Sequence, residues 1–197
     1  MVVDSDLDLM LRVRQGDADS FDELLRRYRT PLVKYFCRLV RDQALAEDLA
    51  QEAFLRVYKA RHRYRPEARF TTWLYRIATN LALNAIRDGR DRRQDGNGSG
   101  EDGETSFEFV DPRVSVEQQL IESDRSRMIR EAIQALPENQ RAAVILHKYQ
   151  DVDYRQIAKV LKVSESAVKS LLFRAYETLR VRLEPLVREG RYEMPGT

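Results

Sequence analysis

The chain has 197 residues, of which 43% are hydrophobic and 34% are charged, and its formal net charge is +2. That length allows one large domain or two small ones, each with enough residues for a modest core. Only 8 glycines and 6 prolines are present, which excludes collagen-like and low-complexity chains and favours helices over a β-sandwich or barrel. A charge this close to neutral does not indicate a polyanionic partner, so evidence for nucleic-acid binding must come from where the basic side chains lie.

Several classes of site are excluded by residue content. Cys37 is the single cysteine, so an internal disulfide is impossible, and His62 and His147 lie too far apart in the sequence to suggest a zinc cluster or a Cys/His nucleophile pair. We expect no metal and no cofactor. The N-terminus lacks the pattern of a signal peptide, and no apolar run reaches membrane-spanning length, so the expected location is cytoplasmic.

Residues 4 to 40 have the apolar spacing of two or three helices. Breaks are predicted at Gln15-Gly16-Asp17 and at Thr30-Pro31. We expect Asp19 or Ser20 to cap the second helix and Pro31 to lie in the first turn of the next one.

The next helix is predicted from about Ala44 to Ala60, and its two sides differ. One side is apolar, whereas the other combines acids, amides and one leucine at helical spacing, which indicates a contact surface. The residues on that outer side are Asp48, Gln51, Glu52, Leu55 and Lys59. Asp48 and Glu52 are spaced as an acid/base or di-metal pair could be, but no matching motif occurs on another helix, so we expect no enzymatic activity.

Between residues 61 and 69 the chain forms a predicted loop that is rich in arginine and tyrosine and is broken by Pro66. Tyr64, Arg65 and Arg69 could hold an extruded base. A solvated basic turn is the alternative interpretation.

The segment from Phe70 to Arg87 is predicted to be one helix with two chemically distinct faces. Phe70, Leu74, Ile77, Leu81 and Ala85 form an apolar stripe. The opposite face has an aromatic ring, guanidinium groups and carboxamides, which suit stacking on a base, phosphate contact and base-edge recognition. That face consists of Trp73, Arg76, Asn80, Asn84 and Arg87. The alternative is a solvated face with Trp73 half-buried.

Residues 88 to 106 contain no apolar side chain and are rich in glycine, so they cannot pack into a core. We therefore predict a helical domain over residues 1–88, a flexible polar linker over 89–114, a second helical domain over 115–184 and a tail over 185–197.

The second domain is predicted to contain a helix-turn-helix. Asp153 can cap a helix from Tyr154 to Leu161, and Ser164 can cap a longer helix from Glu165 to about Val181, with Val163 filling the angle between them. The second helix of such a motif enters the DNA major groove. Its outward residues near the start are Ser166, Lys169, Ser170, Phe173 and Arg174. A plain helical hairpin is the alternative.

Taken together, the motifs resemble a bacterial RNA polymerase sigma factor of the extracytoplasmic-function (ECF) group. Asp48 to Phe54 resembles the core-binding helix of that family, Phe70 to Asn80 its promoter-melting helix, and Leu136 to Arg180 its C-terminal helix-turn-helix. The order of these motifs around a polar linker is more specific than any one of them. The resemblance covers both predicted domains.

This resemblance implies the following partners and roles. The first domain would bind the clamp helices of the polymerase large subunit through Asp48, Gln51, Glu52 and Leu55. Residues 64 to 69 with Asn80 would accept a flipped base of the −10 element, while Trp73, Arg76 and Asn84 would support strand separation. Arg87 would also bind the −10 DNA. Ser166, Lys169, Ser170, Phe173 and Arg174 would contact the −35 duplex. An anti-sigma factor is implied as a further partner.

The chain departs from the family pattern at three positions. Pro66 stands where the base-holding loop often has glycine, and Leu171 and Tyr176 stand where many relatives have arginine. Fewer cationic groups are therefore left for −35 phosphates. Apart from a sigma factor, the residues are compatible with a helix-turn-helix regulator that acts on duplex DNA without polymerase, and more remotely with an all-α enzyme that uses Asp48 and Glu52.

Overall fold

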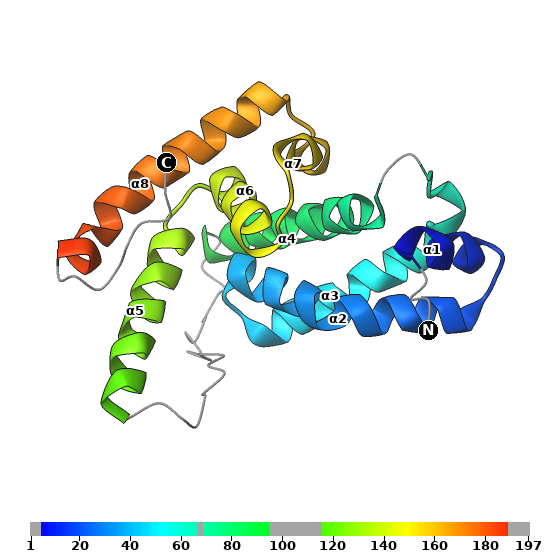
Figure 1. Ribbon diagram of the computed structural model, residues 1–197, viewed down its shortest axis with the longest axis horizontal. Helices are drawn as coiled ribbons and strands as arrows, with labels where there is room; N and C mark the ends of the chain where they lie inside the picture. Colours follow the sequence, from blue (N-terminus) through cyan, green and yellow to red (C-terminus); the bar gives the residue numbers. More distant parts are fainter. Residues whose placement is uncertain (1–4, 67–68, 95–115, 189–197) are drawn as a thin grey trace.

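The computed structural model describes residues 5–66, 69–94 and 116–188, and within these ranges the chain is helical with no strand. The prediction of an all-α protein in two blocks is confirmed (Figure 1). In chain order the elements are α1 (Asp6–Arg14), α2 (Ala18–Val40), α3 (Gln43–Lys59), the 3-10 turn η1 (Arg61–Arg63), α4 (Phe70–Gln94), α5 (Val116–Gln134), α6 (Glu138–Tyr149), α7 (Tyr154–Leu161) and α8 (Glu165–Arg188).

The first block packs α1, α3 and α4 around α2. Its largest fully buried side chains come from three of these helices and include Met10, Leu24, Tyr35, Phe36 and Leu74. Full burial of one such side chain stabilises a fold by about 1.5–3 kcal/mol, so these residues fix how the helices sit against one another.

Helix α2 differs from its prediction at both its start and its middle. Its N-cap is Asp17, whose Oδ1 accepts from the backbone N–H groups of Asp19 and Ser20 at 3.0 and 3.3 Å. The helix also continues through Pro31, where a break was expected. Proline inside a helix costs about 3 kcal/mol, but the side chains on both sides of it, such as Leu24 and Leu32, are fully buried and hold the helix together.

The second block is built from α5 to α8, with Ile145, Ile157 and Leu172 among its fully buried side chains. Helix α8 is tied to α6 by a hydrogen bond of 3.0 Å between His147 Nδ1 and the Tyr176 hydroxyl. The hydrogen bond therefore helps to fix the rotation of α8.

Two helices extend past the predicted domain boundaries at residues 88 and 184. Helix α4 runs on to Gln94, and α8 runs on to Arg188, because Leu183 and Leu186 of α8 are buried against the second block. The remainder of the predicted linker, residues 95–114, lies outside the described residues.

The two blocks pack directly on each other, α7 against α4 and α6 against α2 (Figure 1). At the end of α2 the carbonyl groups lack partners within the helix. Gln134 Nε2 donates to the carbonyl of Arg38 at 2.5 Å, and Arg141 Nη1 donates to that of Leu39 at 2.9 Å. The Arg141 guanidinium also donates, through Nη2, to two carbonyls of its own block. The second block thus caps the C-terminal end of α2.

A second polar contact lies between α4 and the turn after α6. The Tyr75 hydroxyl of α4 donates to Gln150 Oε1. A further contact joins α2 to α6, where the Arg38 guanidinium lies 4.3 Å from the centre of the Tyr149 ring. Tyr75 itself is 4% exposed, so the hydroxyl depends on the second block for its partner.

We expect Arg141→Met to lower the free energy of unfolding by about 2–4 kcal/mol, since it removes charged donors from buried carbonyl groups. Urea unfolding followed by circular dichroism measures this. Arg127→Met is the matched control, because Arg127 forms an exposed pair with Asp124 whose loss should cost less than about 1 kcal/mol. Equal losses in the two variants would show that the Arg141 contacts contribute nothing specific.

We also expect the stability of the protein to fall on acidification through His147. Burial lowers the pKa of His147 below its ordinary value of 6.5, the Lys148 ammonium lowers it further, and Asp151 opposes them. The folded state therefore binds this proton less readily than the unfolded state. The contribution of neutral His147 to the free energy of unfolding is complete above about pH 6.5 and declines as the pH falls below that value.

His147→Gln should reduce the loss of stability between pH 7.5 and 5.5, measured by urea unfolding at both values. An identical loss in the wild type and the variant would mean that other groups account for all of it.

Candidate nucleic-acid and polymerase interface

The outer side of α4 presents the polar row that the sequence predicts. Arg76, Asn80, Asn84 and Arg87 are exposed, whereas the inner residues Phe70, Leu74 and Leu81 are buried. Arg87 Nη2 donates to Asn84 Oδ1 at 3.3 Å, so these two side chains form a local pair. Trp73 is half-buried at the edge of the row. The amphipathic division of this helix is as predicted, with its aromatic member set deeper than the others.

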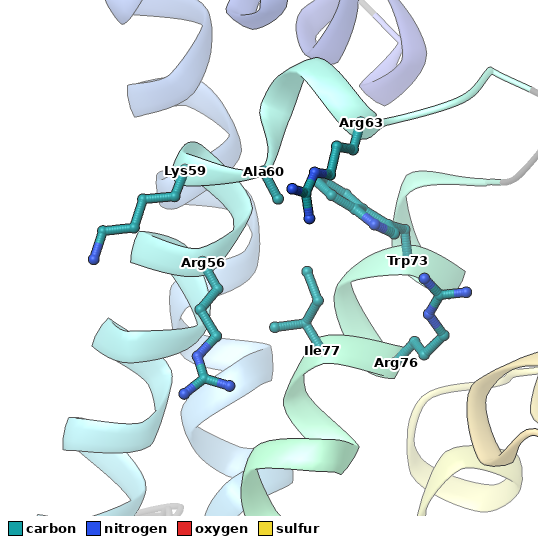
Figure 2. A pocket seen from close by; sticks show the side chains of 7 residues that line it. All are labelled: Arg56, Lys59, Ala60, Arg63, Trp73, Arg76 and Ile77. Carbon is teal, nitrogen blue, oxygen red and sulfur yellow. The ribbon is translucent and has the colours of Figure 1, made fainter.

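A pocket of about 540 Å³ opens beside Trp73, between the end of α3, η1 and the first turns of α4 (Figure 2). The Trp73 indole and the Ile77 side chain supply its apolar surface. Its lining residues are Arg56, Lys59, Ala60, Arg63, Trp73, Arg76 and Ile77. Figure 2 shows the Arg63 guanidinium beside the Trp73 ring. A planar aromatic surface surrounded by cations suits an unpaired base and its phosphates.

Three pocket residues, Arg56, Lys59 and Arg63, are absent from the predicted DNA-binding set. Arg56, Lys59 and Arg63 recur at intervals of three and four residues, which is helical spacing, and that spacing is the signal that could have identified them. Their convergence with Trp73 depends on how α3 and α4 pack, which the sequence pattern does not give.

Tyr64, predicted to contact the −10 strand, is only 2% exposed, so its ring is not available for stacking on a base in this conformation. The centre of its ring lies 5.2 Å from that of Trp73 and 6.4 Å from that of Phe70. The ring centres of Tyr28 and Phe70 lie 5.3 Å apart. These rings support the indole from behind. Tyr64 therefore acts in the structure as a support for the pocket wall.

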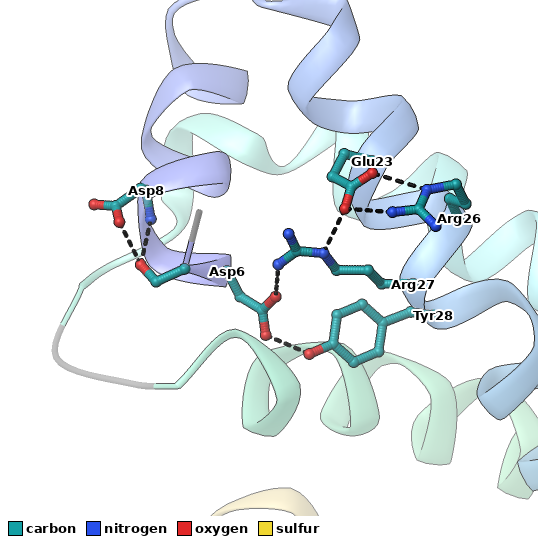
Figure 3. Close-up of polar contacts among 7 residues, drawn as sticks. Asp6, Asp8, Glu23, Arg26, Arg27 and Tyr28 are labelled. Carbon is teal, nitrogen blue, oxygen red and sulfur yellow. Dashed lines mark hydrogen bonds and ion pairs between the residues drawn. The ribbon is translucent and has the colours of Figure 1, made fainter. Parts of the chain in front are cut away.

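The aromatic cluster is held to α1 by a polar network (Figure 3). Asp6 accepts from the Tyr28 hydroxyl and from Arg27 Nη1, the latter at 3.0 Å, and Arg27 Nε donates to Glu23 at 2.7 Å. Burial and the bond to Asp6 raise the pKa of Tyr28. The hydroxyl thus stays protonated and remains a donor, so the network fixes α1 over the rings.

The rest of the predicted loop lies at the surface. Arg65 and Arg69 are exposed, and residues 67 and 68 lie outside the described residues. When the side-chain amide of Gln156 is turned so that its oxygen faces Arg69, that oxygen accepts from Arg69 Nε and Nη1, each at 3.2 Å. Arg69 is therefore engaged with α7 in this arrangement of the two blocks.

On α3, the predicted polymerase-binding residues share one accessible side. Asp48 and Gln51 are exposed and Leu55 is 52% exposed, while Glu52 is partly covered. Arg56 Nε donates to Glu52 Oε1 at 2.6 Å, and this hydrogen bond lowers the pKa of Glu52. The predicted contact side of α3 is therefore accessible, with Leu55 as its exposed apolar member.

The helix-turn-helix has the predicted caps. Asp153 Oδ1 accepts from the Gln156 N–H at 2.8 Å, and Ser164 Oγ accepts from the Ala167 N–H at 3.1 Å. Between α7 and α8 the chain turns at Lys162, which has a φ of 57°. Val163 was expected to fill the inner angle, but it is 37% exposed, because the turn carries its side chain outward.

All five predicted −35 residues are exposed along the first turns of α8: Ser166, Lys169, Ser170, Phe173 and Arg174. The Phe173 ring is 68% exposed, which is unusual for so large an apolar side chain. The Ser170 hydroxyl donates to the Ser166 carbonyl at 3.1 Å. This leaves its oxygen able to accept a hydrogen bond from a ligand.

The described parts of the chain contain neither a metal-binding group of side chains nor a membrane-spanning helix. Over residues 5–66, 69–94 and 116–188, no group of His, Cys, Asp and Glu side chains is arranged to hold a metal ion. Among the helices of the same ranges, none has both the length and the apolar character needed to cross a membrane.

Two models of known protein families match the chain, one in each block. Residues 24–93 match Sigma-70 region 2, and residues 126–179 match Sigma-70 region 4. The chain is 35% identical to the RNA polymerase sigma-H factor of Pseudomonas aeruginosa, over 95% of this chain and 98% of the relative. It is 31% identical to the ECF RNA polymerase sigma-E factor of Haemophilus influenzae, over 93% and 97% of the two chains.

Solved structures share the fold. CnrH, in complex with the cytosolic domain of CnrY, superposes with a TM-score of 0.67 at 20% identity and covers 92% of this chain and 99% of its own. The sigma factor RpoE of Bartonella quintana, in complex with the anti-sigma factor NepR, gives the same TM-score and identity over 85% and 98% of the two chains. From the matched regions and the curated relatives, this chain belongs to the sigma-70 family of RNA polymerase sigma factors, in its ECF group.

Proposed function

We propose that this chain binds core RNA polymerase, directs it to promoters by reading the −35 duplex and a −10 single strand, and promotes DNA melting. The observation that carries the proposal is the basic pocket around Trp73, which lies directly beside the exposed row of α4. A duplex-only regulator has no need for a pocket that fits an unpaired base. The chain is proposed to have no catalytic activity of its own and to work in the cytoplasm, with polymerase.

In this proposal the pocket captures one base extruded from the −10 element. Unpairing costs a few kcal/mol per base, and stacking on an aromatic ring returns about 1–3 kcal/mol. Trp73 supplies the stacking surface, and Arg63 and Arg76, which lie near it in Figure 2, are assigned to the flanking phosphates. Asn80, Asn84 and Arg87 extend the contact along the unpaired strand.

Recognition of the −35 element is assigned to the start of α8. Lys169 and Arg174 supply donors for guanine or phosphate, and Phe173 supplies an apolar contact for a thymine methyl group. The two departures from the family pattern that lie in α8 have a structural explanation. Leu171 is half-buried against the core, and the Tyr176 hydroxyl is bonded to His147, so both side chains stabilise the domain and are not positioned as spare DNA contacts.

The exposed side of α3 is assigned to the clamp helices of the polymerase large subunit. Asp48 and Gln51 provide acceptors, and Leu55 provides the apolar contact at the centre. An anti-sigma factor is proposed as a second protein partner, since CnrH was solved with CnrY and RpoE with NepR.

Transcription with purified core polymerase on genomic DNA tests the main proposal. Adding the protein should create new transcript 5′ ends that share a −35 and a −10 motif. If the set of 5′ ends is the same with and without the protein, the sigma-factor assignment is wrong.

Asp48→Ala combined with Gln51→Ala should weaken binding to core polymerase about tenfold or more, because interface side chains of this kind each contribute about 1 kcal/mol. The dissociation constant is measured by fluorescence anisotropy of labelled protein. Asp22→Ala combined with Gln15→Ala, two exposed residues that do not belong to α3, is the matched control. If both double variants bind as tightly as the wild type, the polymerase contact lies elsewhere.

Lys169→Ala and Arg174→Ala should each weaken holoenzyme binding to a −35 duplex by about 1–3 kcal/mol if the side chain reads a base. Competition with duplexes mutated at single positions separates the possibilities, since a base-reading residue loses discrimination at one position. Arg182→Ala, farther along α8, should change affinity little. Equal loss on every duplex would identify the contact as one to phosphate.

A further inference from the structure

A carboxylate on the first helix acts on two tyrosines that lie behind Trp73. Asp6 stands in the first turn of α1, and its side chain is 27% exposed. One carboxylate oxygen accepts from the Tyr28 hydroxyl, and the other accepts from Arg27 Nη1 at 3.0 Å (Figure 3). Burial raises the pKa of Tyr64, and the charge of Asp6 raises it further. Asp6 is thus near enough to influence both tyrosine hydroxyls.

Both tyrosines pack toward the Trp73 indole. The ring centre of Tyr64 lies 5.2 Å from that of Trp73. Tyr28 reaches the indole through Phe70, whose ring centre lies 5.3 Å from that of Tyr28 and 6.4 Å from that of Trp73. Aromatic pairs at these separations prefer defined relative orientations. A change in the position of either tyrosine ring is therefore passed on to the indole.

Apolar packing holds α1 on the domain independently of Asp6. Leu9, Met10 and Val13 are buried, and the helix packs against α2, η1 and α4. Such burial stabilises the docked helix but is not directional. A hydrogen bond to a charged group is directional and about twice as strong as a neutral one. Loss of the Asp6 carboxylate should therefore leave the fold in place and loosen the rings behind Trp73.

We infer that Asp6 is a positioning residue for promoter melting, which acts by holding Tyr28 and Tyr64 and, through them, the orientation of the Trp73 indole. This inference rests on the proposed function, since Trp73 is the ring on which an unpaired base would stack. Asp6 does not line the pocket, and it precedes the segment 24–93 that matches Sigma-70 region 2. A stacking ring that must first be ordered binds more weakly than one already in place.

The first measurement follows the indole itself in the full-length protein. Trp73 is the only tryptophan in the chain, so its fluorescence reports on this ring alone. Asp6→Ala should shift the emission to longer wavelength and increase quenching by acrylamide, with an unchanged helical circular dichroism spectrum. Asp8→Ala is the matched control, because Asp8 is an exposed acid of the same turn that accepts from the Ser5 hydroxyl at 2.5 Å. The control should leave both fluorescence readouts as in the wild type.

The second measurement separates melting from polymerase binding, on a promoter found by the transcription experiment. Asp6→Ala should bind core polymerase as tightly as the wild type but lower the equilibrium yield of open complex about three- to tenfold, measured by permanganate reactivity of promoter thymines. On a promoter with a mismatched −10 bubble the defect should shrink, because unpairing no longer has to be offset. A domain that was merely destabilised would lose polymerase binding and would not be rescued by the bubble.

Two further variants trace the route from Asp6 to the indole. Tyr28→Phe keeps the ring and removes the donor, so it should show part of the Asp6→Ala defect, and the double variant should be no worse than Asp6→Ala alone. Asp6→Asn retains one acceptor oxygen and should give an intermediate yield of open complex.

The outcomes distinguish this inference from the proposed function. If Asp6→Ala matches the wild type in Trp73 quenching and in open-complex yield, Asp6 has no positioning role. A loss confined to polymerase binding would overturn the inference as well. If even the wild type with polymerase opens no promoter, the proposed function is wrong, and the quenching measurement still decides whether Asp6 holds the indole.

Discussion

A buried hydrogen bond between two helices sets the orientation on which the candidate DNA site depends. The Tyr35 hydroxyl of α2 and the Thr79 hydroxyl of α4 lie 2.7 Å apart, and both residues are almost completely buried. Thr79 also donates to the carbonyl of Tyr75 one turn earlier. Since an unpaired buried hydroxyl is costly, α4 cannot rotate about its axis without losing this pair. The exposed row of α4 is thereby held outward, with Arg76 and Asn80 facing solvent.

The pocket is supported from the far side of the domain as well. Asp6 of α1 holds Tyr28, Tyr28 packs on Phe70, and Phe70 lies with Tyr64 behind the Trp73 ring. A ring that stacks on a base must be pre-positioned, since ordering it at the moment of binding costs affinity. The fold thus uses the N-terminal helix, remote in sequence, to fix one wall of the candidate site.

The helices and most of the candidate site residues could be predicted from sequence periodicity, because that periodicity reflects which sides are buried. The predictions failed where tertiary packing overrides a local rule. Pro31 stays inside α2 because its neighbours are buried, and Tyr64 is buried although the loop around it is basic. The pocket cations Arg56, Lys59 and Arg63 required knowledge of how α3 approaches α4. Docking of the two blocks cannot be read from the hydrophobic pattern, since its polar contacts join donors such as Gln134, Arg141 and Tyr75 to main-chain carbonyls or to a polar side chain.

That docking at the end of α2 has an evolutionary consequence. The acceptors for Gln134 and Arg141 are the main-chain carbonyls of Arg38 and Leu39, which every amino acid possesses. Substitution of either α2 side chain leaves its acceptor in place, whereas a single change at residue 134 or 141 removes a donor. The strength of this contact between the blocks can therefore drift or be selected through the C-terminal block alone, without compensating changes in the block that carries the pocket.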